Sequence, residues 1–265
     1  MAKLSVRVSR CIYCGAGGEL SDEHVIPLGL GGDLILPSSS CATCRDLTSK
    51  FEGRVLRGFM KDARNIGDFP SRRKKKRPTS VSTGVIEASG ATIQREVDVS
   101  SAIGFIHLPE FAPSSFLSGT SPVRGARIQA IDTLRFGKTF EEFVGAQGVT
   151  GLEDRARIDV AAFTRMLAKI AYSFLVGTTG QFERRDSPAL GVLLAETEDP
   201  SNWLGSVFLP PINTSPSTRH SLACKQIKLE SGQTATVVVI KLFATSGACT
   251  YEVVTRSPGW RDYAC

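Results

Sequence analysis

Four cysteines near the N-terminus have the spacing of a metal site. They form two Cys-x-x-Cys pairs, Cys11 with Cys14 and Cys41 with Cys44, and 26 residues lie between the pairs. Each pair can bring two thiolates to one point, and four sulfurs complete the tetrahedral shell that zinc prefers. Four of the seven cysteines of the chain fall within this short segment. We therefore predict a structural Zn²⁺ site that contributes folding free energy to the N-terminal part.

One of the three histidines lies between the two cysteine pairs. His24 follows two acids in the segment SDEHVIP, residues 21–27. A neutral imidazole can take a proton from water near neutral pH, and a carboxylate beside it can hold a hard divalent cation. The alternative is a histidine that is buried on a strand and has no chemical role. His107 and His220 have no acid or cysteine beside them in the sequence, so we expect both to be structural or surface residues.

Apolar segments on both sides of a glycine-rich turn are expected to position His24. The segments HVIPL (24–28) and DLILP (33–37) have strand character, and three glycines lie in or beside the turn between them. The second cysteine pair then opens a predicted helix from Ala42 to about Asn65, because apolar residues recur there at four-residue steps. The expected order is strand, turn, strand and helix, with cysteine pairs at both ends.

Positive charge is concentrated in the first third of the chain. Residues 1–77 carry 15 Lys and Arg against 8 Asp and Glu, whereas the remainder carries 17 against 18. Two groups of cations account for most of the excess. One is a stripe at helical spacing, formed by Lys50, Arg54, Arg57, Lys61 and Arg64. The other is a continuous run, formed by Arg72, Arg73, Lys74, Lys75, Lys76 and Arg77. This asymmetry favours a polyanionic partner, DNA in the first place with RNA left open, over a merely solvated face.

These segments together resemble the HNH endonuclease family, the ββα-metal fold, in its version with a four-cysteine zinc. The resemblance covers residues 11–60 and is carried by CIYCG, SDEHVIPLGLGG, CATC and SKFE. It implies that His24, at the end of the first strand, is the general base that activates water. It also implies that Glu23 holds a catalytic Mg²⁺ or Mn²⁺. The expected activity is hydrolysis of DNA phosphodiester bonds, in a bacterial or phage setting.

The chain departs from the family at two positions. Arg45 stands where the family has Asn or His as a second metal ligand, and arginine does not ligate Mg²⁺. The asparagine of the middle motif is also missing, with Asp33 or one of the serines 38–40 in its vicinity. Asp22 is either a supporting acid or an exposed turn residue.

Two explanations of Arg45 stay open. In the first, Glu52 completes the cation site with Glu23 while Arg45 contacts the scissile phosphate, since Glu52 follows Arg45 by seven residues and shares its helical face. Asp46 and Thr48 are lesser ligand candidates. In the second, Glu52 pairs with Arg45 or Lys61 at the surface, and the protein is a catalytically degenerate, zinc-dependent DNA-binding module.

The remainder of the chain predicts an α+β fold. We expect a zinc-bound HNH-like domain over residues 1–70, a basic linker over 71–80, and an α+β domain over 81–265. The last would combine an antiparallel or mixed sheet with one long core helix from about Glu153 to Val176, ended by Gly177. Strand-like segments are 83–99, 127–136, 190–196 and the pair 221–243, which has ESGQ as its turn.

Composition narrows the setting further. No apolar segment has the length of a membrane span or the form of a signal peptide, so we expect a cytoplasmic protein without a membrane partner. Cys224, Cys249 and Cys265 lack metal-site spacing and are expected to be free or buried thiols. The role of residues 81–265 and the oligomeric state stay open. A third class of function, an interaction protein with the zinc part as scaffold, therefore stands beside the two above.

Overall fold

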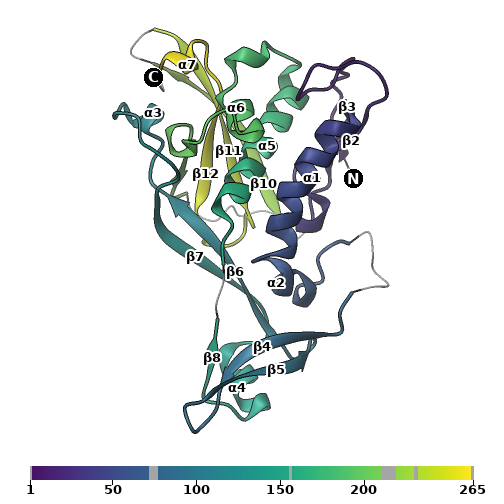
Figure 1. Cartoon of the computed structure of the whole chain (residues 1–265), viewed down its shortest axis with the longest axis vertical. Coiled ribbons are helices and arrows are strands. Elements are labelled where there is room, and N and C mark those ends of the chain that lie inside the picture. The colour runs from purple at the N-terminus through teal and green to yellow at the C-terminus, as the bar shows by residue number, and fades with distance from the viewer. Residues whose placement is uncertain (1, 72–76, 155–156, 210–218, 230–231, 264–265) are drawn as a thin grey trace.

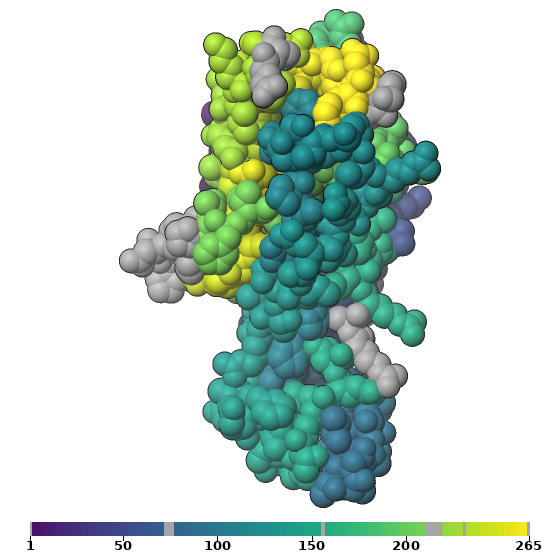
Figure 2. Space-filling model, turned by 90° about the vertical axis from the view of Figure 1, so that its left-hand side faces the viewer, coloured from purple at the N-terminus to yellow at the C-terminus, as the bar shows by residue number. Residues whose placement is uncertain are grey.

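The computed structural model describes residues 2–71, 77–154, 157–209, 219–229 and 232–263. Within these residues the chain forms a larger body and a smaller one, which are joined by the long hairpin of β6 (Ile103–Phe111) and β7 (Ile128–Gly137) (Figure 1). Figure 2 shows the smaller body, coloured blue and teal, at the lower end of an elongated molecule. The predicted α+β class is confirmed.

The N-terminal part has the predicted order of strand, turn, strand and helix. Strand β2 (Ser21–His24) pairs antiparallel with β3 (Leu34–Ser40), β1 (Ala2–Lys3) pairs parallel with β3, and helix α1 (Ala42–Arg57) follows. The prediction of a strand over HVIPL is wrong, because β2 ends at His24. The next residues lead into a short 3₁₀ helix, η1 (Leu28–Leu30), which ends at Gly31 with a positive φ of 90°.

The predicted helix from Ala42 to Asn65 is two helices. α1 stops at Arg57, because Gly58 has φ −90° and ψ −122°, and the chain then turns into α2 (Lys61–Ile66). A Cβ at Gly58 would lie 2.3 Å from the Arg54 carbonyl oxygen, so only glycine fits this break. The predicted cationic stripe is therefore divided between two helices of different direction.

Four antiparallel strands form the C-terminal sheet. Their order is β10 (His220–Lys228), β11 (Thr234–Leu242), β12 (Thr250–Arg256) and β9 (Leu204–Val207). The predicted antiparallel pairing of β10 and β11 is confirmed, while residues 230–231 of the predicted ESGQ turn lie outside the described residues. The predicted strand over residues 190–196 is wrong, because most of that segment forms α6 (Pro188–Leu194), whose first turn is capped by the Ser187 hydroxyl. Proline at the first helical position is compatible with a helix start.

The long helix α5 (Val160–Thr179) packs against α1, α6 and this sheet (Figure 1). It begins later than predicted, because Asp159 caps it and Glu153 belongs to β8 (Gly151–Glu153). It also continues beyond Gly177, which packs closely against Leu4. By length and composition α5 could span a membrane, but most of it is buried inside the protein, as is usual for a core helix.

The main hydrophobic core does not divide at residues 71–80. One cluster of buried side chains extends from Cys11 through α1 and α5 to Trp260. A smaller cluster, which includes Val85 and Phe143, belongs to the smaller body of β4 (Ser80–Ile86), β5 (Thr92–Asp98), β8 and α4 (Phe140–Gln147). The N-terminal part and the C-terminal sheet therefore share a core, while the inserted segment between them has its own.

Within the predicted linker, residues 72–76 lie outside the described residues. The remaining short elements are α3 (Ser115–Ser118), η3 (Arg184–Asp186), η4 (Pro200–Asn202) and α7 (Trp260–Tyr263).

Candidate functional site

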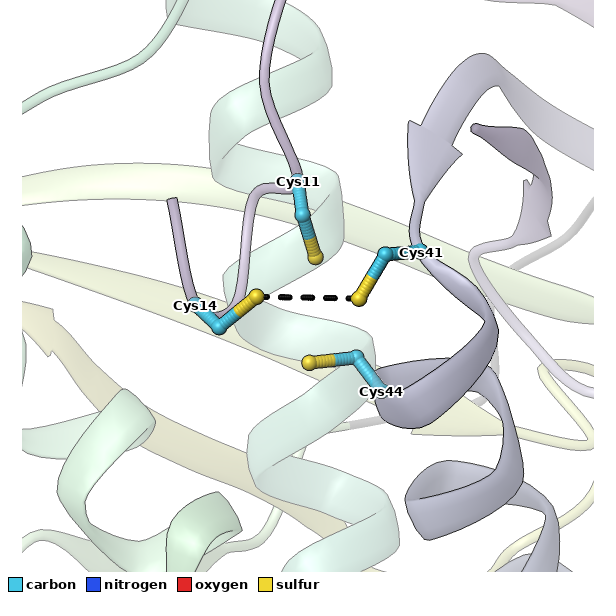
Figure 3. Close-up of side chains that lie close together, drawn as sticks. All are labelled: Cys11, Cys14, Cys41 and Cys44. Carbon is cyan, nitrogen blue, oxygen red and sulfur yellow. Dashed lines mark hydrogen bonds between the residues drawn. The ribbon is translucent and has the colours of Figure 1, made fainter. Parts of the chain in front are cut away.

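The four cysteines of the two Cys-x-x-Cys pairs converge on one point (Figure 3). Their sulfurs all lie within 4.8 Å of one another, and the Cys14 and Cys41 Sγ atoms are 3.6 Å apart. Sulfurs around a tetrahedral zinc are about 3.8 Å apart when each Zn–S bond is about 2.3 Å. A disulfide would need a far shorter separation, of about 2.05 Å. The cluster is thus positioned to bind a metal ion and is consistent with structural zinc.

Helix α5 and the segment after it hold the first cysteine pair in place. Cys11 and Cys14 lie on a loop, whereas Cys41 caps α1 and Cys44 lies in its first turn. The Tyr172 hydroxyl donates a hydrogen bond to the Ile12 carbonyl at 2.8 Å, and Arg184 donates to the Cys14 carbonyl at 3.1 Å. The loop therefore depends on the C-terminal half of the chain for its position.

A buried lysine lies at the centre of the predicted catalytic residues. Lys169 on α5 is fully buried, and its Nζ lies 2.6 Å from Glu23 Oε1 and 3.0 Å from Glu52 Oε1. It also donates to the backbone carbonyl of His24. Burial by itself would lower the pKa of Lys169, but the two carboxylates outweigh burial and raise the pKa above its ordinary value. The ammonium is therefore charged.

Sequence analysis did not select Lys169. It lies in the apolar segment MLAKIAY, in the middle of a helix whose other buried residues are nearly all uncharged. A single charged residue inside such a segment was the available signal, because a lysine is almost never fully buried unless it is paired. Its partners, however, come from β2 and α1, which are distant in sequence.

The predicted residues Glu23, His24, Arg45 and Glu52 line one cavity of about 260 Å³. Glu52 Oε1 lies 3.0 Å from Lys169 Nζ, an ion pair that neither explanation of Arg45 included. Arg45 is exposed, and its Nε lies 3.8 Å from Asp46 Oδ1. Thr48 also lines the cavity, but its hydroxyl donates to the Arg45 carbonyl within the helix.

The other candidates near His24 have structural roles or lie elsewhere. Asp22 accepts a hydrogen bond from the Ser38 backbone N–H at 3.0 Å and lies 3.6 Å from Lys3, so it fixes the β2–β3 pairing. Ser39 is buried and donates to the Leu36 carbonyl. Asp33 is exposed and lines a different cavity, beside His220.

The surroundings of Glu23 and Glu52 bear on whether this pair fits a divalent cation. Within the described ranges, the four cysteines are the one group of three or more His, Cys, Asp or Glu side chains with ligand atoms within 4.8 Å of one another. Glu23 Oε1 and Glu52 Oε1 share the Lys169 ammonium. The pair in this arrangement holds an organic cation and does not fit a metal ion bridging the same two oxygens.

The predicted DNA-binding cations differ in their surroundings. Lys50 and Lys61 are exposed, and Arg57 is exposed with its Nε donating to the Gly53 carbonyl. Arg54 is exposed but forms an ion pair with Asp159, the cap of α5, at 2.6 Å. Of the run 72–77 only Arg77 is described; it pairs with Asp68 and donates to the Phe69 carbonyl.

Arg64 is partly buried and acts within the fold. It donates to the carbonyls of Gly29 and Leu56, each at 2.6 Å, and burial lowers its pKa. It therefore connects α2 with the loop that follows His24.

The other two histidines are both hydrogen bonded. His107 Nε2 lies 2.6 Å from Asp154 Oδ2, and its Nδ1 lies 3.0 Å from Thr133 Oγ1. His107 therefore has an acid beside it in the structure, although none is near it in the sequence. His220 Nε2 donates to the Leu30 carbonyl at 2.9 Å, and its Nδ1 accepts from the Phe243 N–H. Burial lowers the pKa of His220 to about 4.

Cys224 is exposed and Cys249 buried, and Cys265 lies outside the described residues.

No family model, no curated protein and no solved structure matches this chain. The four-cysteine cluster and the cavity beside His24 are the features of this chain that bear on its function.

Proposed function

We propose that the protein is an HNH-type endonuclease that binds DNA and hydrolyses phosphodiester bonds at the cavity between β2 and α1. The observation that carries this proposal is the placement of His24. It stands at the end of β2, in a cavity with Glu23, Glu52 and Arg45, on a strand–turn–strand–helix unit with a four-cysteine cluster. These side chains come from separate segments, and their convergence supports a common chemical role.

In the proposed reaction His24 is the general base. Its imidazole takes a proton from water, the water oxygen attacks phosphorus, and the bond from phosphorus to the 3′ oxygen breaks. The leaving oxygen takes a proton from solvent. Arg45 is exposed at the same cavity, where its guanidinium can form charge-assisted hydrogen bonds with the non-bridging phosphate oxygens. No step is assigned to a divalent cation, because the carboxylates that would hold it share the Lys169 ammonium.

Exposed cations on α1 and α2, the two helices that also contribute residues to the cavity, support a DNA substrate. Lys50 and Arg57 lie on α1 and Lys61 lies on α2, all of them exposed. A cationic surface of this kind binds phosphates and positions the duplex without reading its sequence.

A nicking assay tests the proposal. Zinc-loaded, full-length protein is incubated with supercoiled plasmid, without added divalent cation and with Mg²⁺ or Mn²⁺. We expect nicking by the wild type and by His107→Ala, whose histidine lies in another cavity, and loss of at least about 100-fold in His24→Ala. Equal nicking by His24→Ala and the wild type would exclude His24 as the base.

The second candidate is a DNA-binding module that does not hydrolyse DNA. The position of Lys169 between the two carboxylates favours it, together with Arg45 at the position of the family's ligand. This candidate predicts salt-dependent DNA binding that is equal in the wild type and His24→Ala, with no nicking under any of the conditions. Absent or salt-insensitive DNA binding would contradict both candidates and favour an interaction protein.

A further inference from the structure

We propose that the ammonium of Lys169 is the resident cation of this site and excludes divalent cations from the Glu23–Glu52 pair. A metal ion binds between these carboxylates with substantial affinity only when the positive charge of Lys169 is removed. The inference rests on the proposed function and deepens it, because it states which cation neutralises the carboxylates of the same cavity. Its metal-binding part does not require that His24 hydrolyse DNA.

Lys169 Nζ is surrounded by carboxylate and backbone carbonyl oxygens. Its Nζ lies at ion-pair distance from two carboxylates, 2.6 Å from Glu23 Oε1 and 3.0 Å from Glu52 Oε1. It also donates to the backbone carbonyls of His24 and Val25, the latter at 3.4 Å. A metal ion that bridges two carboxylates lies about 2.0–2.6 Å from their oxygens. The Nζ atom lies at nearly that distance from the same two oxygens, so the ammonium and a bridging metal ion would need the same position.

Burial makes this arrangement difficult to reverse. Lys169 is fully buried, and its neighbours on α5, Ala168 and Ile170, are buried as well. A surface lysine could swing into water when a metal ion arrives, whereas the Lys169 side chain has no exposed surface. Moving a charged ammonium into the surrounding apolar core would be strongly unfavourable. The lysine is therefore a fixed part of the site.

Charge balance gives the proposal a measurable consequence. Two ionised carboxylates and one ammonium leave a net charge of about −1, and a neutral residue in place of lysine leaves about −2. That excess negative charge, in a largely buried position, attracts a divalent cation more strongly than the wild-type site does. A purely structural lysine far from any carboxylate would have no such effect on metal affinity.

The same contacts make Lys169 a positioning residue for the proposed reaction. It holds the carboxylate of Glu23 and the backbone of His24, both on β2, against Glu52 of α1. The C-terminal half of the chain thereby sets the geometry of a site whose lining residues all precede residue 72.

Manganese binding tests the proposal in the absence of DNA. Full-length, zinc-loaded protein is titrated with Mn²⁺, and free Mn²⁺ is followed by electron paramagnetic resonance. Mn²⁺ prefers carboxylate over thiolate ligands, and the zinc content is checked before and after. We expect Lys169→Met to bind one Mn²⁺ at least about tenfold more tightly than the wild type. The gain should disappear in Lys169→Met combined with Glu52→Gln.

Lys241→Met is the matched control. Lys241 is also buried, but its Nζ donates to the carbonyls of Leu209 and Ala248 and lies near the Thr250 hydroxyl. This variant should bind Mn²⁺ as the wild type does. An unchanged affinity in folded Lys169→Met would overturn the proposal.

A further measurement does not require Lys169→Met to fold. In the wild-type background, Glu52→Gln should leave Mn²⁺ binding unchanged, because no metal ion lies between the carboxylates. If the wild type binds Mn²⁺ tightly and Glu52→Gln abolishes that binding, the proposal is wrong. Absence of DNA cleavage would overturn the proposed function and leave these metal-binding outcomes as they are.

Discussion

Lys169 Nζ lies 2.6 Å from Glu23 Oε1, so helix α5 contacts the residue next to His24. This contact crosses the boundary that a division of the chain at residues 71–80 would draw. The polar contacts that anchor the N-terminal unit on α5 include this ion pair and the hydrogen bond from Tyr172 to the Ile12 carbonyl.

Replacing Lys169 by methionine should destabilise the fold. The carboxylates of Glu23, which is buried, and Glu52, which is partly buried, would lose their common counter-charge. Removing one partner of a buried ion pair costs about 3–5 kcal/mol. Adding Glu23→Gln and Glu52→Gln to Lys169→Met should recover part of that loss, because no uncompensated charge then remains. Urea unfolding at pH 7 measures both free energies. A loss below about 1 kcal/mol in the single variant would contradict a charged lysine at this position.

Removing one ligand of the cysteine cluster should release the metal ion. We expect Cys14→Ser to lose bound zinc and to unfold at a lower temperature, because a structural zinc site contributes folding free energy. Cys224→Ser is the control, since this exposed cysteine lies on β10 and outside the cluster. Zinc content and thermal unfolding are measured together. Retention of one zinc per chain by Cys14→Ser with an unchanged midpoint would show that the cluster is not a structural zinc site.

The cations of α1 and α2 should separate into two groups. Lys50→Gln and Lys61→Gln should weaken DNA binding and lower the slope of log affinity against log salt by up to about 1 each, because each exposed lysine can neutralise a phosphate. Arg64→Met should instead lower the free energy of unfolding by about 1–3 kcal/mol, because the carbonyls of Gly29 and Leu56 lose a charged donor.

Titration of DNA binding at several salt concentrations and urea unfolding distinguish these effects. Equal loss of stability in Lys50→Gln and Arg64→Met would contradict this separation of roles.

His220 should make the stability of the fold depend on pH. Its pKa of about 4 in the folded protein lies below the ordinary value of about 6.5 in the unfolded chain. Between these values the unfolded chain binds a proton that the folded protein does not bind. The free energy of unfolding should therefore fall as pH falls from about 6.5 toward 4, by up to about 1.4 kcal/mol per pH unit. Above pH 6.5 this contribution is complete.

The variant His220→Gln isolates that effect. A glutamine amide can donate to the Leu30 carbonyl and accept from the Phe243 N–H, but it does not titrate. Urea unfolding of both proteins at pH 7, 6 and 5 compares their slopes, so other titrating groups cancel. A variant that loses as much stability as the wild type between pH 7 and 5 would contradict the role assigned to His220.

The sequence by itself determined the features that depend on local spacing. Two Cys-x-x-Cys pairs identify the metal cluster, because each pair needs only a tight turn to bring its sulfurs together. The seven-residue interval from Arg45 to Glu52 places both side chains on one face of a helix, and both line the same cavity. Local pattern failed at Gly58, where the helix breaks, and at residues 190–196, where apolar composition suits a buried helix as well as a strand.

Only the tertiary structure decided which cation lies between Glu23 and Glu52. No interval in the sequence relates Lys169 to either acid, because their contact depends on how α5 packs against β2 and α1. The pairing of His107 with Asp154 arises in the same way, because His107 lies on β6 and Asp154 directly follows β8. Side chains from distant segments meet through the packing of whole elements, and that packing follows from the shared core and not from any local motif.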